Sequence, residues 1–313
     1  MMPPEQLWAG EACWTGPIAF VDLDDVQELP GRIALPTCPV VGLGAVDSAL
    51  AAVVDCIVEA PATAQSIARQ VLAAPRAAAV VTALLRIMPS LSAEDGLVAE
   101  SLAYATLQGS SEHHAWLEAR QSARPPLPGG VIVSRNDDCI EIMLDNQANG
   151  NAIDRTMRDV LHEALSLAGI DPQIERVRLG AAGRTFSIGA ELSEFGTTTD
   201  PAAAFEIRAM TLPAHAAARC ADKLEVQVNG ACVGAGLELA AWGRQVTADP
   251  DAWFQLPELM MGILPGAGGC VSLTRRIGRQ RTALMILSGK RISARQALEW
   301  GLIDAIVDQP SFD

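Results

Sequence analysis

Short strand-like segments alternate with helix-like segments over the second half of the chain, and this alternation restricts the possible folds more than any other feature. Residues 130–135 (GVIVSR) and 139–145 (CIEIMLD) predict two strands joined by a hairpin at the polar sequence NDD. Residues 153–170 place apolar side chains at helical spacing, with Asp154 at the start and Gly169 at the close. The pattern predicts a strand pair followed by an amphipathic helix.

Three further segments continue this alternation. Residues 177–183 (VRLGAAG) and 224–230 (LEVQVNG) each predict a strand, and residues 246–257 (VTADPDAWFQLP) predict a third strand region that runs into a turn. Strands that alternate with helices are typical of an α/β domain in which helices pack on a sheet. We therefore expect the fold class α/β for this part of the chain.

The first part of the chain has a different character. Residues 1–60 mix Pro and Gly with short apolar runs, which predicts strands or extended pieces joined by turns. Residues 61–121 are rich in Ala and Leu, with apolar side chains every three or four positions, which predicts helices. The Pro/Gly stretch 122–130 (SARPPLPGG) predicts a linker. We expect an N-terminal region, residues 1–128, and a core, residues 129–313.

Composition limits the class of protein. Half of the 313 residues are hydrophobic and 19% are charged, which is sufficient for a large core of Ala, Val, Leu and Ile. No uninterrupted apolar window of about 18 residues predicts a membrane span, and the opening MMPPEQLWAGEACW lacks the pattern of a secretion signal. The formal net charge of -14 argues against a nucleic-acid ligand. We expect a cytoplasmic protein that binds neither nucleic acid nor membrane.

Cysteines and histidines do not form a metal-binding pattern. The seven cysteines lack C-x-x-C spacing, so we expect reduced and mostly buried thiols. His113 and His114 are expected to be exposed on a helical segment, and His162 and His215 have no ligand partner at a suitable spacing. The sequence predicts no metal site.

Residues 228–240 (VNGACVGAGLELA) place a glutamate behind a run of very small residues. We expect strand, turn and helix here, because the Gly-Ala-Gly turn at 234–236 lets the backbone bend tightly and leaves room for a close approach. The first amides of a helix have no partner within it, so they can bind an oxygen with developing negative charge. Gly189 and Ala190 precede a second helix-like start. Two such donors aimed at one oxygen would form an oxyanion hole.

Two glutamates, Glu238 and Glu258, stand near such turns. A close pair of carboxyl groups can divide the roles of general acid and general base, because burial raises and separates their pKa values. Each feature also has a structural interpretation: Gly-Ala-Gly after a strand can mark tight packing, and a lone Glu in a helix usually lies on its solvated face. The residues alone leave both interpretations open and identify no substrate.

Five motifs follow one another in the second part of the chain. They are residues 151–165 (NAIDRTMRDVLHEAL), 184–195 (RTFSIGAELSEF), 226–240 (VQVNGACVGAGLELA), 254–278 (FQLPELMMGILPGAGGCVSLTRRIG) and 286–308 (ILSGKRISARQALEWGLIDAIVD). Together they resemble the enoyl-CoA hydratase/isomerase (crotonase) superfamily over about residues 130–313. The resemblance implies a spiral of ββα units, assembly as a homotrimer or hexamer, and an acyl-CoA thioester as substrate. It implies no cofactor other than the coenzyme A of the substrate.

The resemblance also implies roles for single residues. The backbone amides of Ala190 and Ala235 would bind the thioester oxygen, assisted by the helix that starts after Ala235. Glu238 would deprotonate the water that attacks C3 of a 2-enoyl thioester, and Glu258 would deliver a proton to C2. The remaining residues expected at the substrate are Ile188, Gly189, Gly234 and Gly266.

This chain departs from the family pattern at several positions. Where relatives have a third glycine in the second loop, Ala235 adds a methyl group and keeps its amide. Ile188 stands where a small alanine is common, on the side of the adenine end of CoA, so a carrier-protein thioester is an alternative substrate. Glu191 replaces the Asp of the usual Gly-Ala-Asp. The candidate phosphate partners are Arg178, Arg184 and Arg275.

The order of segments along the chain is also unusual for the family. Its members normally continue past the GLIDAIVD motif with helices that cover the acyl pocket, and residues 61–121 resemble that tail. Residues 49–61 resemble the WGLIDAIVDQP segment at 300–310. We expect a permuted or duplicated crotonase whose tail precedes its core and covers the site in cis or in trans. A shared Ala-rich composition is the alternative explanation.

The resemblance implies hydration of a 2-enoyl thioester, carried by CoA or by an acyl carrier, to a 3-hydroxyacyl thioester. The protein would then be a hydro-lyase. The alternatives are an enoyl-CoA isomerase, a thioester-hydrolysing relative, and a non-catalytic subunit that binds an acyl thioester.

Overall fold

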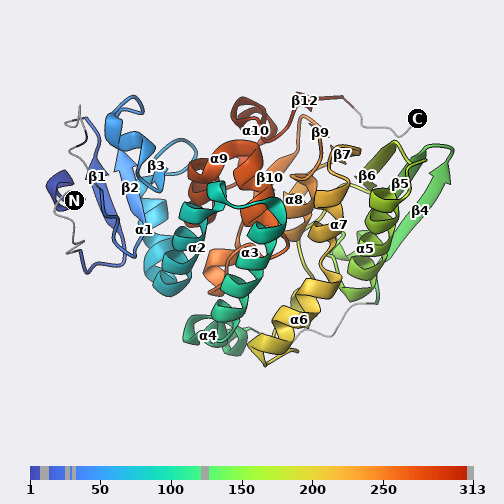
Figure 1. The fold of residues 1–313 in the computed structure, drawn as a ribbon, viewed down its shortest axis with the longest axis horizontal. Helices are drawn as coiled ribbons and strands as arrows, with labels where there is room; N and C mark the ends of the chain where they lie inside the picture. The colour runs from blue at the N-terminus through green and yellow to red at the C-terminus, as the bar shows by residue number, and fades with distance from the viewer. Residues whose placement is uncertain (8–13, 25–28, 30–32, 121–126, 309–313) are drawn as a thin grey trace.

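The computed structural model describes residues 1–7, 14–24, 29, 33–120 and 127–308, and Figure 1 shows its fold. The strands are β1 Ala19–Asp22, β2 Val40–Leu43, β3 Cys56–Ile57, β4 Gly130–Asn136, β5 Cys139–Asp145, β6 Arg176–Ala181, β7 Leu224–Val228, β8 Ala231–Val233, β9 Gln245–Ala248, β10 Trp253–Gln255, β11 Ile292–Ser293 and β12 Ala305–Ile306. The α-helices are α1 Ala64–Ala73, α2 Pro75–Ile87, α3 Ala93–Gln108, α4 Ser111–Ala119, α5 Arg155–Ile170, α6 Pro201–Thr211, α7 Pro213–Arg219, α8 Ala235–Ala240, α9 Gly269–Ser288 and α10 Ala294–Trp300. The predicted α/β class and the helices that precede the core are confirmed.

The main sheet has six strands in the order β12-β9-β7-β6-β5-β4. Neighbouring strands run parallel except β4 and β5, which form an antiparallel pair with Gly130 opposite Asp145 and Asn136 opposite Cys139. The predicted hairpin is confirmed, and Asp137 in its turn has a φ of 53°. Residues of β5 alternate between buried and half-buried positions because one face of the strand packs on the core.

The segment predicted as a single strand region, residues 246–257, contains parts of two strands in different sheets. β9 joins the main sheet beside β7, whereas β10 pairs with β8 and β11 in a smaller three-stranded sheet. A turn closed by the Ala252 amide and the Asp249 carbonyl separates them. The expectation of one strand region was wrong because Pro250 interrupts the strand pattern.

Helix α5 begins as the sequence predicts, with the Asp154 side chain accepting a hydrogen bond from the Met157 amide at 2.9 Å. The helix ends at Ile170, the last residue of the predicted segment and one residue beyond Gly169, where the Asp171 amide bonds the Leu167 carbonyl. The predicted extent of this helix is therefore confirmed to within about two residues at each end.

The second helix-like start, expected after Gly189-Ala190, is only a single turn of 3-10 helix, Leu192–Glu194. The Glu191 side chain caps it by accepting from the Ser193 amide at 2.8 Å. A further 3-10 turn, Glu258–Met261, follows β10 and ends at Gly262 with a φ of 70°. Both short turns contribute residues to the wall of one pocket.

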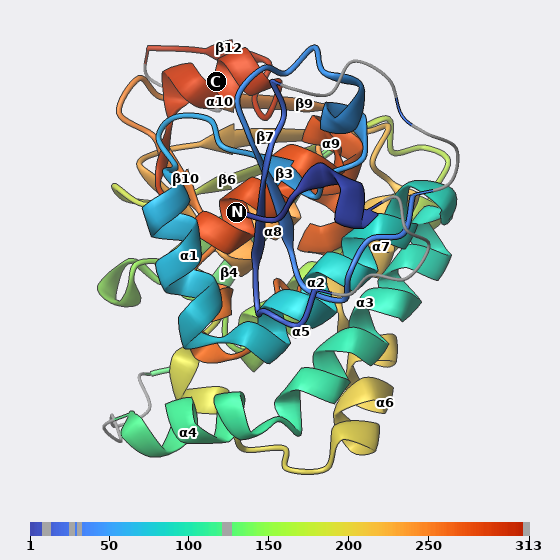
Figure 2. The ribbon, with the colours of Figure 1, turned by 90° about the vertical axis from the view of Figure 1, so that its left-hand side faces the viewer.

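Helices α1 to α4 pack on the core of the same chain (Figures 1 and 2). Helices α2 and α3 contact α9, and α3 also contacts α6. Ile67, Val81 and Leu97 belong to one buried cluster with Phe254 and Leu284. The N-terminal helices therefore share a continuous hydrophobic core with the second part of the chain, in cis.

The first strands form a separate three-stranded parallel sheet in the order β1-β2-β3, at the left of Figure 1. The sheet has its own small apolar cluster, which includes Leu7, Val21 and Leu50. It is joined to α2 by a paired contact in which the Arg86 guanidinium donates to both oxygens of Asp55, at 2.8 and 2.7 Å. The expected strand-and-turn character of residues 1–60 is confirmed for the part that the structure describes.

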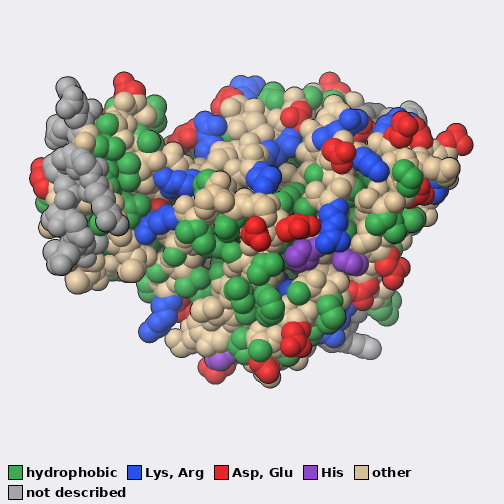
Figure 3. Space-filling model, viewed as in Figure 1, with side chains coloured by type: hydrophobic (Ala, Val, Ile, Leu, Met, Phe, Trp, Pro, Cys, Tyr) green, Lys and Arg blue, Asp and Glu red, His purple; other side chains and the backbone are tan. Residues whose placement is uncertain are grey.

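Residues 122–126 of the expected linker lie outside the described residues, and the boundary between residues 128 and 129 stays a prediction. Of the helices that the structure describes, none is by itself long and apolar enough to cross a bilayer, although α1 and α2 would pass that test as a pair bent by 111°. Lys and Arg side chains are scattered among Asp and Glu on the face shown in Figure 3.

Candidate functional site

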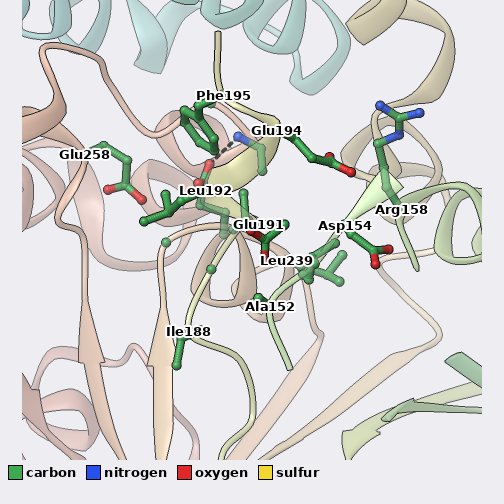
Figure 4. Close-up of a pocket in the computed structure, with 18 of the residues that line it drawn as sticks. Ala152, Asp154, Arg158, Ile188, Glu191, Leu192, Glu194, Phe195, Leu239 and Glu258 are labelled. Carbon is green, nitrogen blue, oxygen red and sulfur yellow. Dashed lines mark hydrogen bonds between the residues drawn. The ribbon is translucent and has the colours of Figure 1, made fainter. Parts of the chain in front are cut away.

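A pocket of about 340 Å³ opens where five segments of the chain meet. Its walls come from the β5–α5 connection, the loop at 188–195, the start of α8, the 3-10 turn Glu258–Met261 and the loop before α9. Helix α3 of the N-terminal region adds Tyr104, and α6 adds Arg208. Figure 4 shows labelled residues of this lining around the cavity.

The first loop is held by Ser187. Its hydroxyl donates to the Asn151 carbonyl at 2.8 Å and accepts from the Gly189 amide at 3.1 Å. Gly189 has a φ of 106°, which favours glycine, and its carbonyl accepts from the Ile153 amide at 2.8 Å. These bonds fix the backbone at Gly189, and the next residue, Ala190, lines the pocket wall.

The second loop joins β8 to α8 and lies against the first. The Val233 amide donates to the Ser187 carbonyl at 2.9 Å, and a methyl group on Gly236 would lie 2.5 Å from the Ser187 Cβ atom. Gly234 has a φ of 48°, so the backbone reverses there and α8 begins at Ala235. Only small residues allow the two loops to approach this closely.

The amides of Ala190 and Ala235 have no hydrogen-bond acceptor among the described residues, although the adjoining amides of Gly189, Glu191 and Gly234 do. A methyl group on Gly189 would lie 3.8 Å from the Ala235 nitrogen, so the two loops bring the amides to the same part of the pocket. Two unpartnered N–H groups facing one cavity can bind an oxygen atom that carries negative charge.

Glu238 lies in α8 but is only 2% exposed. One of its oxygens, Oε2, accepts from the Ala267 amide at 2.5 Å and from the Gly269 amide at 2.8 Å. Burial raises the pKa of this carboxyl to about 7, while the amides and Arg208 act to lower it. The solvated-face interpretation of this glutamate is wrong, because the α9 loop and α3 cover it.

Glu258 begins the 3-10 turn and is 8% exposed. Its Oε2 atom is buried without a hydrogen-bond partner among the described residues. Burial raises the pKa of Glu258 well above its ordinary value, and the charge of Glu238 raises it further. Figure 4 shows the Glu258 carboxyl group directed toward the middle of the lining residues. The protonated acid is therefore favoured at this position.

The other residues expected at the substrate all line the pocket. Ile188 is 49% exposed, and a methyl group on Gly150 would lie 3.0 Å from its Cγ2 atom. Gly266 presents its carbonyl to the Arg208 guanidinium and leaves space for the Tyr104 ring, because a methyl group there would lie 2.2 Å from the ring.

The arginines expected as phosphate partners do not line the pocket. Arg178 lies 3.8 Å from the carboxylates of Glu141 and Glu225, and those partners balance its charge. Two other arginines, Arg155 and Arg158, do line the pocket. Sequence reasoning missed them because both belong to the exposed face of an amphipathic helix.

Three further residues at the site were missed: Glu100, Tyr104 and Arg208. Glu100 is fully buried and accepts from the amides of Gly268 at 2.7 Å and Cys270 at 2.9 Å. The Arg208 guanidinium carbon lies 4.3 Å from the centre of the Tyr104 ring. One sequence feature could have indicated two of them: Glu100 and Tyr104 lie four residues apart, which places both side chains on one face of α3.

His113 was expected to be exposed and is 2% exposed. Its Nδ1 atom lies 2.8 Å from the Met261 carbonyl, and its ring stacks on Trp116 at 5.6 Å. The expectation was wrong because α4 folds back on the 3-10 turn that begins with Glu258. His113, which belongs to the N-terminal region, therefore contacts and stabilises that turn.

The six described cysteines are free and buried, and Cys13 lies outside the described residues. Within the described ranges, no group of three or more His, Cys, Asp or Glu side chains is arranged to hold a metal ion.

Comparison with known proteins gives a consistent result. The family model for enoyl-CoA hydratase/isomerase matches residues 134–312. A curated relative, the 2,3-dehydroadipyl-CoA hydratase of Escherichia coli K12, is 33% identical over 184 residues, which cover 56% of this chain and 68% of the relative.

Solved structures agree with this match. A protein from Mycobacterium abscessus described as an enoyl-CoA hydratase/isomerase is 36% identical, with a TM-score of 0.53 over 57% of this chain and 71% of the other. The enoyl-CoA hydratase of Thermoplasma volcanium is 31% identical, with a TM-score of 0.51 over 57% of this chain and 72% of the other.

Proposed function

Because the chain belongs to the enoyl-CoA hydratase/isomerase family, we propose that it adds water to the double bond of a 2-enoyl thioester. The product is a 3-hydroxyacyl thioester. The observation that carries this proposal is the meeting, in one pocket, of two unpartnered amides and two buried carboxyl groups. Hydration needs a site for negative charge on the thioester oxygen, a base for water and an acid for carbon.

The thioester oxygen binds between the amides of Ala190 and Ala235. Attack of water on C3 moves the double-bond electrons toward the thioester oxygen, and the two N–H groups stabilise the resulting enolate. Removal of one preorganised donor of this kind lowers kcat by a factor of about 10²–10³. This role is supported by the lack of a hydrogen-bond acceptor for either amide among the described residues.

Glu238 takes a proton from the attacking water, and Glu258 delivers a proton to C2. The raised pKa of Glu258 favours the protonated form that an acid needs. Burial raises the pKa of Glu238 to about 7, while the two amides that bond it act in the opposite direction and favour its ionised form. One hydroxyl group and one proton are added, and exchange with solvent restores both carboxyl groups. Side chains and main-chain amides supply every step.

We propose that coenzyme A carries the acyl group. The relative named as a 2,3-dehydroadipyl-CoA hydratase supports a CoA thioester, and Arg155 places positive charge at the pocket for phosphate groups, whereas the charge of Arg158 is paired with Asp159. Ile188 occupies part of the same wall, so a carrier-protein thioester remains the competing substrate. Assembly as a homotrimer or hexamer is proposed by family resemblance, and light scattering of the purified protein tests it.

The loss of the conjugated thioester absorbance of crotonyl-CoA tests the function. We expect absorbance to fall with formation of 3-hydroxybutyryl-CoA, identified by mass spectrometry. Movement of the double bond in a 3-enoyl-CoA without water addition would assign an isomerase instead, and release of free thiol would assign a hydrolase. If the protein binds both CoA thioesters and carrier-protein thioesters but converts neither, the assignment as an enzyme would be overturned.

A further inference from the structure

Four consecutive backbone amides at the start of α9 point alternately at two buried carboxylates. The amides of Ala267 and Gly269 bond Glu238, whereas those of Gly268 and Cys270 bond Glu100. The two glutamates come from segments far apart in the chain, α8 of the core and α3 of the N-terminal region. This short loop donates hydrogen bonds to both of them.

The loop can take this shape only with small residues. A methyl group on Gly269 would lie 2.4 Å from Cγ of Glu238, and one on Gly268 would lie 2.5 Å from Cβ of Ala214. Gly268 has a φ of 102°. Because the loop has no bulky side chain to anchor it, the carboxylates that receive its amides determine where those amides point.

Glu100 fixes one half of the loop. Each of its two oxygens accepts one amide, which only the ionised form does well, since a protonated carboxyl group has a donor on one oxygen. Its negative charge is offset by Arg208, whose Nη2 atom lies 3.9 Å away. The Arg208 side chain is itself held over Tyr104 and at the Gly266 carbonyl.

We propose that Glu100 is a positioning residue: its carboxylate fixes the amides of Gly268 and Cys270, so that the intervening amides of the loop hold the Glu238 carboxylate in place. The N-terminal region thus supplies a required part of the site, and does more than cover it. The kinetic consequences rest on the proposed function, whereas the role of Glu100 in ordering the loop does not.

The charge state of Glu100 depends on the groups around it. The groups that face Glu100 are Glu238 from α8, Glu258 from the 3-10 turn, Arg208 from α6, Tyr104 from its own helix and Cys270 from α9. Burial and the neighbouring Glu238 charge raise the pKa of Glu100 to about 8. The amides of Gly268 and Cys270 and the charge of Arg208 act to lower it, so these partners are what favour the carboxylate form.

The test uses Glu100→Gln in the full chain. Glutamine keeps the size of the side chain but has one acceptor atom, and its NH₂ group faces one of the two amides. We expect faster hydrogen–deuterium exchange in a peptide that covers residues 266–271. Glu94→Gln is the matched control, since Glu94 lies on the same helix with its side chain 72% exposed, and it should leave this exchange unchanged.

The kinetic arm separates positioning from a purely structural role. Glu100→Gln should lower kcat by about 10², as expected for a displaced catalytic group, with little change in KM. Glu100→Asp keeps a carboxylate that can accept from the loop amides, so it should lose less kcat than Glu100→Gln, and it serves as the second variant if Glu100→Gln does not fold.

Unchanged exchange of residues 266–271 in Glu100→Gln would overturn the proposal. An unchanged kcat in that folded variant would overturn it as well, as would a loss of kcat in Glu100→Asp as large as that expected for Glu100→Gln. If the wild-type protein hydrates no 2-enoyl thioester, the proposed function fails, and the exchange measurement still decides the role of Glu100.

Discussion

Gly234 and Glu258 are in direct contact: a methyl group added to Gly234 would lie 2.5 Å from the Oε1 atom of Glu258. Gly234 also has a φ of 48°, which favours glycine. The loop that presents the Ala235 amide is therefore the same loop against which the Glu258 carboxyl group packs. A change at this one glycine acts on two parts of the proposed site together.

Gly234→Ala should displace the Glu258 carboxyl group and lower kcat for hydration by about 10², because misplacement of a reacting group by about 1 Å has that effect. Steady-state kinetics with crotonyl-CoA measures it. Gly301→Ala is the control, since Gly301 has a φ of 76° and no heavy atom within 4 Å of an added methyl group. Equal losses of kcat in both variants would show that backbone strain alone is responsible.

The pH dependence of hydration follows from the two carboxyl groups. Glu238 must be ionised to take a proton from water, so the rate should fall as pH drops through about 7. Glu258 must be protonated, so the rate should also fall as pH rises through its raised pKa. The apparent values belong to the coupled pair. A profile that stays flat down to the ordinary glutamate pKa of about 4.3 would contradict these assignments.

The contact between Arg86 and Asp55 should stabilise the fold without affecting the chemistry. The Asp55 side chain is 3% exposed and would lose the cation that bonds both of its oxygens in Arg86→Ala, whereas Arg279 would stay 3.9 Å away, so the cost should fall below the ~3–5 kcal/mol of an uncompensated buried charge. We expect a lower denaturant midpoint with unchanged kcat in the folded variant. Arg135→Ala, which removes a partner of Asp171 from a more exposed pair, should lower the midpoint much less.

Local patterns in the sequence predicted local structure well. The β4–β5 hairpin and the start of α5 rest on strand alternation and on the Asp154 cap, which depend on neighbouring residues alone. Residues 246–257 were predicted less well, because β9 and β10 in this segment pair with strands of different sheets. Strand partners of this kind depend on tertiary structure, which no local pattern contains.

The site was predicted only in part for a similar reason. Ala190, Ala235, Glu238 and Glu258 lie on motifs with a recognisable order, and the structure brings all four to one pocket. Glu100 contacts Gly268 across 168 positions of the chain, and nothing in an Ala-rich helix marks it as a partner of that loop. His113 was assigned to the surface because its partner, the Met261 carbonyl, lies 148 positions away.

The central claim is that Glu238 and Glu258 act on the same substrate, one as base and one as acid. The most direct measurement compares hydration of crotonyl-CoA by the wild-type protein and by Glu258→Gln, with binding of 3-hydroxybutyryl-CoA measured by calorimetry. The account predicts loss of hydration by at least about 10² with binding largely retained. Turnover by Glu258→Gln at the wild-type rate would contradict it.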